Sequence, residues 1–258
     1  MDPIANTRET DALLLAERVG KDFGRFAAVE QVSLAVRRGE LKAIIGPNGA
    51  GKTTLFNMLS GEIKPSRGRI FYRGEDITRA PAYRLAHVGI GRSFQVTNVF
   101  RRSSVLENVR IAAQAKRHRN YDFASSAEGL TQTTEVAERV LETIGLAQYR
   151  DSPASSLSHG DQRRLEIGIV LATEPELVLL DEPTAGMSRE EARSTMALIR
   201  DVAISRTVLF VEHNMEFVMG VSQSVVVMQS GRIIAEGTPA EIRADAEVRR
   251  AYLGNLYE

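Results

Sequence analysis

The segment Ile44–Leu59, with the sequence IIGPNGAGKTTLFNML, decides the fold of this chain. It contains the octet GPNGAGKT, residues 46–53, which fits the pattern G-x-x-x-x-G-K-[ST] at every fixed position. A short apolar run precedes the octet, as in a buried strand, and apolar residues follow it at helical spacing. Gly61 suits the left-handed position that ends such a helix. The octet therefore lies between a strand and a helix, the context that a phosphate-binding loop requires.

The residue types of the octet predict that it binds a nucleoside triphosphate. Its glycines allow a tight turn with backbone N–H groups close to phosphate oxygens. Lys52 supplies positive charge for the β- and γ-phosphates, the Thr53 hydroxyl is suited to ligate Mg²⁺, and Thr54 is placed to bond an α-phosphate oxygen. The alternative is a glycine-rich turn with a chance Lys-Thr pair. The predicted nucleotide-binding residues of this loop are Gly46, Pro47, Asn48, Gly49, Ala50, Gly51, Lys52, Thr53 and Thr54.

Length and composition are those of an ordinary globular protein, with either one large domain or a core with a smaller lobe. The 258 residues include 33 Lys and Arg and 33 Asp and Glu, so the overall charge does not indicate a nucleic-acid partner. The absence of cysteine excludes a disulfide framework and a thiolate metal site, and fits a reducing cytoplasm. No secretory signal is evident, and no apolar run approaches the roughly 18–20 residues of a membrane span. We therefore expect any role at a membrane to depend on partner subunits.

Two further apolar segments end in residues with catalytic chemistry. The first, LVLLDE at 177–182, is continuously apolar, as in a strand covered on both faces, and ends in Asp181 and Glu182. Functional groups gather at the carboxyl ends of such strands. Asp181 is suited to orient Mg²⁺, and Glu182 to accept a proton from an attacking water; a solvated acidic pair is the alternative. The second, TVLFVE at 207–212, leads into His213, which would face the same edge unless it is merely structural.

The remaining pattern predicts a sheet of short strands and an insertion of helices. We expect strands within 12–36, on either side of a turn at 21–24, and at 69–76 and 87–94, with a hairpin around Gly231 near the end of the chain. Phe23, beside the first turn, would either stack on a nucleotide base or pack in the sheet. Helical spacing at 105–115 and 135–144, with a loop-like stretch at 120–130, makes residues 97–155 a mainly helical insertion.

Three helix starts carry sequence signatures of N-caps. Ser158 is a natural N-cap, and Asp161 is placed to complete a capping box. Ser188 and Glu191 form a second capping box, for a helix that runs to about Ala203. A third short helix starts at Thr238–Pro239, with Glu241 at its third position.

Together these motifs resemble the ATP-binding subunits of ABC transporters over nearly the whole chain. GPNGAGKT looks like the Walker A motif, LVLLDE like Walker B with its catalytic glutamate, and SLSHGD at 156–161 like the signature loop. The resemblance implies that Gln95 is the Q-loop residue, His213 the switch histidine and Phe23 the adenine-stacking aromatic. The catalytic residues that it implies are Lys52, Gln95, Glu182 and His213. The Mg²⁺ site that it implies comprises Thr53, Gln95 and Asp181, and the signature residues that reach a partner's ATP are Ser158 and Gly160.

The fold implied is α/β: a P-loop NTPase core with a mainly parallel sheet, an N-terminal antiparallel β subdomain and an inserted helical subdomain. We expect one domain over residues 12–254. Residues 12–96 and 156–254 would form the core and the β subdomain, and residues 97–155 the helical subdomain, with the signature helix starting near 158.

Within the family, the segments RSFQ (92–95), LEIG (165–168), DEPTAGM (181–187) and AYLG (251–254) look most like the ATPases of branched-chain amino-acid uptake. Importers of urea, amides or aromatic acids share these features. The resemblance implies a homodimer or heterodimer of cassettes at the cytoplasmic face of the inner membrane, held there by two permease subunits and served by a periplasmic solute-binding protein. The alternatives are an export ATPase of the lipopolysaccharide-transport type and a soluble non-transport ABC ATPase acting on DNA or ribosomes.

Three residues depart from the pattern of the family. His159 replaces a glycine and Asp161 a glutamine of the usual LSGGQ signature, and Ser188 stands at the position of the D-loop aspartate. His159 would add a side chain where backbone normally approaches phosphate. Asp161 would place negative charge near an anion, unless it is engaged in the N-cap of its helix.

Overall fold

The computed structural model describes residues 11–93, 99–117 and 127–250. Within these residues the strands form two sheets, a six-stranded sheet with the order β10-β9-β3-β8-β7-β6 and a four-stranded sheet with the order β2-β1-β4-β5. The strands are β1 (Ala12–Phe23), β2 (Phe26–Arg37), β3 (Leu41–Ile45), β4 (Arg67–Tyr72), β5 (Glu75–Asp76), β6 (Ile90–Arg92), β7 (Leu177–Asp181), β8 (Thr207–Val211), β9 (Ser224–Gln229) and β10 (Arg232–Gly237).

The six-stranded sheet is parallel except at one edge. β6, β7, β8, β3 and β9 run parallel to one another, and β10 pairs antiparallel with β9. Every residue of β3, β7 and β8 is buried, including Lys42 of β3, and for β7 the continuous apolar sequence predicts this burial in a strand covered on both faces. The four-stranded sheet is antiparallel throughout. The predicted α/β class, with a mainly parallel core sheet and an antiparallel β unit, is confirmed.

Each face of the six-stranded sheet supports a hydrophobic core of its own. On one face, side chains such as Ile44, Leu179 and Leu209 pack with the helix after the P-loop and with the four-stranded sheet. On the other face, alternate residues of the same strands, such as Ala43 and Leu180, pack with the helices that follow. The sheet is therefore the central layer of the molecule.

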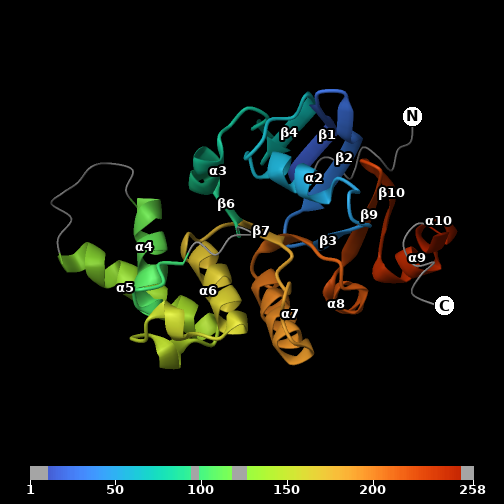
Figure 1. Cartoon of the computed structure of the whole chain (residues 1–258). Coiled ribbons are helices and arrows are strands. Elements are labelled where there is room, and N and C mark those ends of the chain that lie inside the picture. The colour runs from blue at the N-terminus through green and yellow to red at the C-terminus, as the bar shows by residue number, and fades with distance from the viewer. Residues whose placement is uncertain (1–10, 94–98, 118–126, 251–258) are drawn as a thin grey trace.

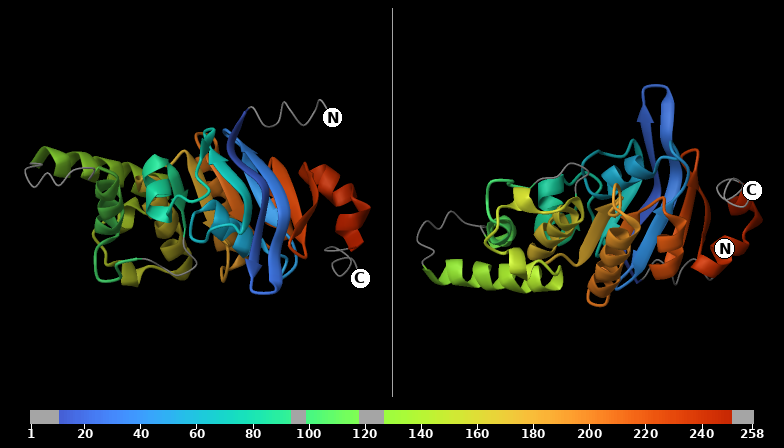
Figure 2. Two further views of the ribbon diagram at one scale, coloured as in Figure 1. Left: turned by 90° about the horizontal axis from the view of Figure 1, so that it is seen from above. Right: turned by 60° about the horizontal axis from the view of Figure 1, so that its bottom comes forward.

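The helices are distributed on both sides and at both ends of this layer. Figure 1 shows α4 and α5 gathered on the opposite side of the molecule from α9 and α10, and both views of Figure 2 agree. α4, α5 and α6 pack against one another. The helices are α2 (Lys52–Leu59), α3 (Ala82–Val88), α4 (Val105–Arg117), α5 (Ala127–Thr143), α6 (His159–Ala172), α7 (Arg189–Ala203), α8 (Met215–Val221), α9 (Pro239–Ala244) and α10 (Ala246–Val248).

Two of the three predicted N-caps have the expected geometry in full. Ser188 and Glu191 form a capping box at the start of α7, and Thr238 and Glu241 form another at the start of α9. The hydroxyl of Ser158 accepts the backbone N–H of Asp161, as predicted. The Asp161 carboxylate, however, accepts the Ser158 hydroxyl at 3.0 Å and not its backbone N–H, so the predicted capping box is wrong in its second half.

Three predictions of secondary structure were wrong in extent. The expected strand at 87–94 is reduced to β6, because α3 occupies residues through Val88 and ends at Gly89, which has a φ of 109°. The expected strand at 69–76 is two strands, because Arg73 and Gly74 both adopt positive φ and turn the chain. The helix expected at 135–144 already begins at Ala127, inside the stretch that we expected to be a loop.

Candidate nucleotide site

The P-loop has the backbone geometry that its glycines predict. It connects the buried strand β3 to α2, whose first residue is Lys52. Gly46, Gly49 and Gly51 all have positive φ, from 78° to 152°. A Cβ atom on Gly51 would lie 2.5 Å from the carbonyl oxygen of Ala28 in β2, whereas a Cβ on Gly49 would meet no atom of the described chain within 4 Å. Gly51 is therefore required by the fold itself, and Gly49 lies at an open face of the loop.

Lys52 lies inside the loop that it is predicted to serve. It is buried, and its amino group donates hydrogen bonds to the carbonyl oxygens of Gly46 at 2.7 Å and Pro47 at 3.0 Å. Burial lowers the pKa of Lys52, and the nearby carboxylates of Glu182 and Asp181 oppose this shift. The fold therefore brings the lysine of the P-loop within electrostatic reach of the two acids at the end of β7.

Asp181 is a buried carboxylate at this edge of the sheet. It is only 2% exposed, and neither of its oxygens has a hydrogen-bond partner in the part of the chain that the structure describes. Burial raises its pKa, which the charge of Arg92 opposes. A buried carboxylate is costly when no donor bonds to it, and neither Asp181 oxygen is occupied by one, so Asp181 fits the predicted Mg²⁺ ligand. Thr53, the second candidate ligand, is exposed at the start of α2.

Arg92 belongs to this site, although we did not predict it from the sequence. Its guanidinium donates to Asn57 Oδ1 at 2.5 Å and to the Ser60 hydroxyl, lies 3.7 Å from Asp181, and stacks 5.2 Å from the ring centroid of Phe56. It therefore ties β6 to α2 and β7. The sequence signal that could have identified it was an arginine at the end of a short strand. A cation in a buried position is rarely without a partner, so Arg92 could have been expected to pair with other site residues.

Glu182 and His213 follow adjacent strands. Asp181 of β7 pairs with Val211 of β8, and the backbone N–H of Glu182 donates to the Val211 carbonyl at 3.0 Å. Glu182 has a φ of 46°, a left-handed conformation that is uncommon for a residue with a side chain. His213 is 59% exposed. Both side chains thus belong to the edge of the sheet that carries the P-loop, as predicted.

The start of α6 is accessible, as a signature loop requires. Ser158 and His159 are exposed, whereas Leu157 and Gly160 are buried. A Cβ on Gly160 would lie 2.6 Å from Oε1 of Glu191, in the first turn of α7. Hydrogen bonds from the backbone and hydroxyl of Ser188, and from the backbone of Gly160, lower the pKa of Glu191. One carboxylate therefore connects the beginnings of α6 and α7.

The three departures from the signature and D-loop patterns have local partners. A Cβ on Gly186 would lie 3.2 Å from the imidazole Cε1 of His159, so this ring packs over the loop that follows Glu182. Asp161 accepts the Ser158 hydroxyl and lies 3.6 Å from Arg164, which balances its charge. Ser188 serves as the N-cap of α7.

Phe23 is the predicted site residue that the structure places least closely. Phe23 lies at the turn of the β1–β2 hairpin, which projects beyond the sheet in Figure 2, and 52% of its surface is exposed. Phe26, its cross-strand partner, is also exposed, at 66%, and is as well placed for a stacking role. Gln95 lies outside the described residues, as does the predicted tail segment 251–254.

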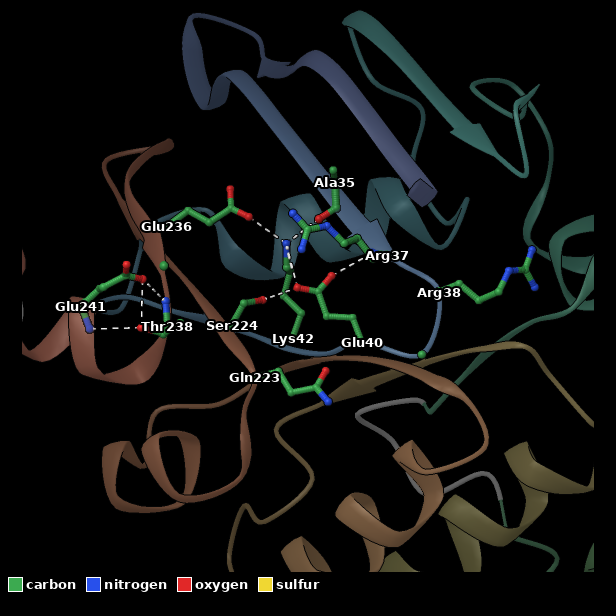
Figure 3. A pocket seen from close by; sticks show the side chains of 12 residues that line it. Ala35, Arg37, Arg38, Glu40, Lys42, Gln223, Ser224, Glu236, Thr238 and Glu241 are labelled. Carbon is green, nitrogen blue, oxygen red and sulfur yellow. Dashed lines mark hydrogen bonds and ion pairs between the residues drawn. The ribbon is translucent and has the colours of Figure 1, made fainter. Parts of the chain in front are cut away.

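A separate cavity of about 350 Å³ lies at the opposite, amino-terminal ends of β3 and β9. Figure 3 shows that Glu40, Lys42, Ser224 and Glu236 are joined to one another by hydrogen bonds and ion pairs, whereas the Arg38 side chain lies apart from them. The buried amino group of Lys42 donates to Glu236 at 2.8 Å, and Ser224 donates to Glu40 at 2.5 Å. This network makes up part of the polar lining, and it shares no residue with the P-loop.

The described residues contain no cluster of three or more His, Cys, Asp or Glu side chains that would by itself hold a metal ion. A metal here would therefore depend on phosphate oxygens in addition to protein ligands. The described helices also include none with both the length and the apolar character needed to cross a bilayer.

Comparisons with known proteins agree with this geometry. The family model described as "ABC transporter" matches residues 29–185, and the model described as "Branched-chain amino acid ATP-binding cassette transporter" matches residues 232–256. The chain is 41% identical over 244 residues to the high-affinity branched-chain amino acid transport ATP-binding protein LivG of Salmonella typhimurium, covering 90% of this chain and 94% of LivG. It is 35% identical to the lipopolysaccharide export system ATP-binding protein LptB of Acidithiobacillus ferridurans, covering 95% of this chain and 98% of LptB.

Solved structures show the same fold. The ADP conformation of an ATP-binding cassette of an ABC transporter is 31% identical, with a TM-score of 0.83 over 94% of this chain and 99% of that one. A dimeric cassette in a post-hydrolysis state, bound to ADP and Pi, is 25% identical, with a TM-score of 0.74 over 88% of this chain and 98% of that one. With a P-loop, a buried acidic strand and an exposed signature loop on one scaffold, the chain belongs to the ABC transporter family, as one of its ATP-hydrolysing subunits.

Proposed function

We propose that this ATPase energises the import of branched-chain amino acids, or of a related small polar solute, through a membrane permease. The placement of Lys52 within electrostatic reach of Asp181 and Glu182 at the carboxyl edge of the sheet carries the catalytic half of the proposal. The match of residues 232–256 to the branched-chain amino acid family, and the likeness to LivG, support the solute class.

ATP would bind with its phosphates in the P-loop and its adenine near Phe23. The Lys52 amino group, which now donates to loop carbonyls, would exchange these partners for phosphate oxygens. Thr53 and Asp181, with Gln95, would hold Mg²⁺, which neutralises charge on the β- and γ-phosphates. Glu182 would take the proton from the attacking water, and His213 would orient that water and the γ-phosphate.

A second cassette would complete the site. The start of α6, where Ser158 is exposed and Gly160 is buried against Glu191, would direct backbone N–H groups at the γ-phosphate held by the partner once Glu191 releases the Gly160 N–H. ATP would hold the two cassettes together, and hydrolysis would release them. The dimeric relative with ADP and Pi supports this arrangement. The pair would lie at the cytoplasmic face of the inner membrane, attached to two permease subunits and served by a periplasmic solute-binding protein.

The experiment is transport by the reconstituted complex. The chain is co-purified with the two permeases encoded beside its gene and placed in proteoliposomes, and uptake of radiolabelled leucine is measured with the corresponding binding protein and Mg-ATP. We expect uptake that requires both ATP and the binding protein, and that disappears with Glu182→Gln. ATP hydrolysis without any uptake of leucine, isoleucine, valine, urea or an amide would overturn the solute assignment. Extraction of lipopolysaccharide in place of uptake would favour the export alternative that the likeness to LptB keeps open.

A further inference from the structure

Glu212 is a buried carboxylate to which the catalytic scheme above gives no role. It directly follows β8 and has 0% of its surface exposed. No lysine or arginine side chain among residues 11–93, 99–117 and 127–250 forms an ion pair with it. Burial of a charged group is destabilising unless hydrogen bonds compensate, so a glutamate at this place requires a reason.

The compensation comes from four hydrogen bonds, divided between two loops. Oε1 of Glu212 accepts the backbone N–H of Thr184 at 3.2 Å and the Thr184 hydroxyl. Oε2 accepts the backbone N–H of His213 at 2.7 Å and that of Asn214 at 3.1 Å. One oxygen thus holds the loop after β7, and the other holds the loop after β8.

The loop after β7 contains the strained residue of the site. Glu182, two residues before Thr184, has a φ of 46°, and such a conformation persists only where the surroundings hold it. On one side its backbone N–H donates to Val211, and its carbonyl accepts the N–H of Ala185 at 3.1 Å. On the other side, the bonds from Thr184 to Glu212 hold the same turn.

The loop after β8 contains His213, whose orientation also depends on Glu212. In addition to the hydrogen bond from the His213 backbone, the imidazole Nδ1 lies 3.5 Å from Oε2 of Glu212. A carboxylate beside Nδ1 favours the tautomer with the proton on that nitrogen, which leaves Nε2 to act as the acceptor on the far side of the ring. The His213 ring and the turn that contains Glu182 therefore both lie against the same buried carboxylate, that of Glu212.

We propose that Glu212 is a positioning residue that clamps the loop carrying Glu182 to the loop carrying His213, so that the proton acceptor and the histidine are aligned together on the attacking water. This inference rests on the proposed function for the roles of Glu182 and His213. Glu212 itself would touch neither ATP nor water. Its carboxylate, not merely a polar side chain, is required because four donors must all be accepted.

Glu212→Gln tests the clamp with little change in shape. Glutamine has one acceptor oxygen and an amide that donates, so the donors of one loop would face another donor. We expect kcat for ATP to fall by ~10–100-fold, the scale reached by a misplacement of about 1 Å, with KM changed by less than about twofold, because the P-loop is untouched. Glu40→Gln is the matched control: it alters a largely buried glutamate that also accepts two hydrogen bonds, at the opposite ends of the strands, and should leave kcat unchanged.

A double-mutant comparison separates positioning from general loss of structure. In the background His213→Ala, the change Glu212→Gln should lower kcat far less than it does in the wild type, because one of the two aligned groups is already absent. Equal fold-losses in both backgrounds would overturn the clamp. If Glu212→Gln melts below the assay temperature, Thr184→Val replaces it, since that change removes a single hydroxyl donor and should also lower kcat without raising KM.

Amide hydrogen exchange of the nucleotide-free protein distinguishes failure of this inference from failure of the proposed function. The amides of Thr184, His213 and Asn214 should exchange at least ~10-fold faster in Glu212→Gln than in the wild type. Wild-type phosphate release with an unchanged kcat in Glu212→Gln would refute the clamp and leave the ATPase assignment intact. Absence of ATP hydrolysis by the wild-type chain would refute the proposed function. The clamp would then be refuted separately if the three amides exchanged at the same rate in Glu212→Gln as in the wild type.

Discussion

Nη2 of Arg92 lies 3.7 Å from Oδ2 of Asp181, and both side chains are largely buried, with 12% and 1% of their surfaces exposed. The arginine comes from β6 and the aspartate from the end of β7, so the two strands present a cation and a carboxylate at the same edge. The separation is too long for a hydrogen bond. Arg92 therefore partly compensates the negative charge of Asp181, and the two carboxylate oxygens of Asp181 stay available to a metal ion.

Asp181→Asn should stabilise the nucleotide-free protein. Burial raises the pKa of Asp181 in the folded chain above its unfolded value, so ionisation destabilises the fold at pH values above the folded pKa. This effect disappears as the pH falls below the unfolded pKa, because the carboxyl is then protonated in both states. The melting temperature of Asp181→Asn should exceed that of the wild type at neutral pH, by an amount that shrinks in acid, as scanning calorimetry without Mg²⁺ or ATP would measure.

The control for this prediction is Asp201→Asn, which alters an exposed carboxylate of α7 and should move the melting temperature by no more than about 2 °C. A neutral-pH loss of stability in Asp181→Asn would contradict the view that this carboxylate awaits a cation. Asp181→Asn should also lose Mg²⁺-dependent ATP hydrolysis.

Glu182→Gln should lower the turnover of ATP by ~10²–10⁴ while ATP binding is retained. The reason is that glutamine keeps the shape of the side chain at a strained backbone position but cannot accept a proton. Phosphate release under saturating ATP and binding of a fluorescent ATP analogue would be measured together. Glu190→Gln, in the exposed first turn of α7, serves as the control. Hydrolysis at the wild-type rate by Glu182→Gln would remove the assigned base.

Lys52→Ala should weaken ATP binding by ~10–100-fold, the value of a charged hydrogen-bonded contact to phosphate. The amino group is already directed into the P-loop, where it donates to Gly46 and Pro47, and alanine has no group to replace it. Titration with labelled ATP would measure the change. Lys116→Ala, which removes an exposed lysine paired with Glu174, should bind ATP like the wild type.

Two glycines of the P-loop should separate stability from binding. Gly46→Ala places a methyl group against the backbone carbonyl of Met228, which cannot move freely. We therefore expect the free energy of unfolding to fall by at least about 1–3 kcal/mol. Gly49→Ala meets no atom of the described chain, and only its left-handed φ of 78° opposes it, at about 1–2 kcal/mol. Gly49→Ala should nevertheless lose ATP affinity, because its methyl group would project from the open face of the loop, where we propose that the phosphates bind. Denaturant unfolding and ATP titration of both variants would test this contrast.

Local signals in the sequence were sufficient for the elements of the site that depend on neighbours in the chain. The octet around Lys52, the acidic end of β7 and the capping boxes at Ser188 and Thr238 all use residues within seven positions of one another. Their hydrogen bonds and backbone angles follow from residue type and spacing. The left-handed pair Arg73–Gly74, which divides the expected strand at 69–76, was also a local signal, but one that the apolar pattern concealed.

By itself, then, the sequence determined that this chain has a P-loop, a buried acidic strand and a signature helix in the order typical of its family. Only the tertiary structure decided which groups surround them. Arg92 reaches Asn57 and Asp181 across three elements, and Glu212 joins Thr184 to His213 although 28 residues separate Glu212 from Thr184. The physical reason is that a buried polar group must find its partners wherever the fold brings them, and strand order, not local periodicity, sets which segments meet.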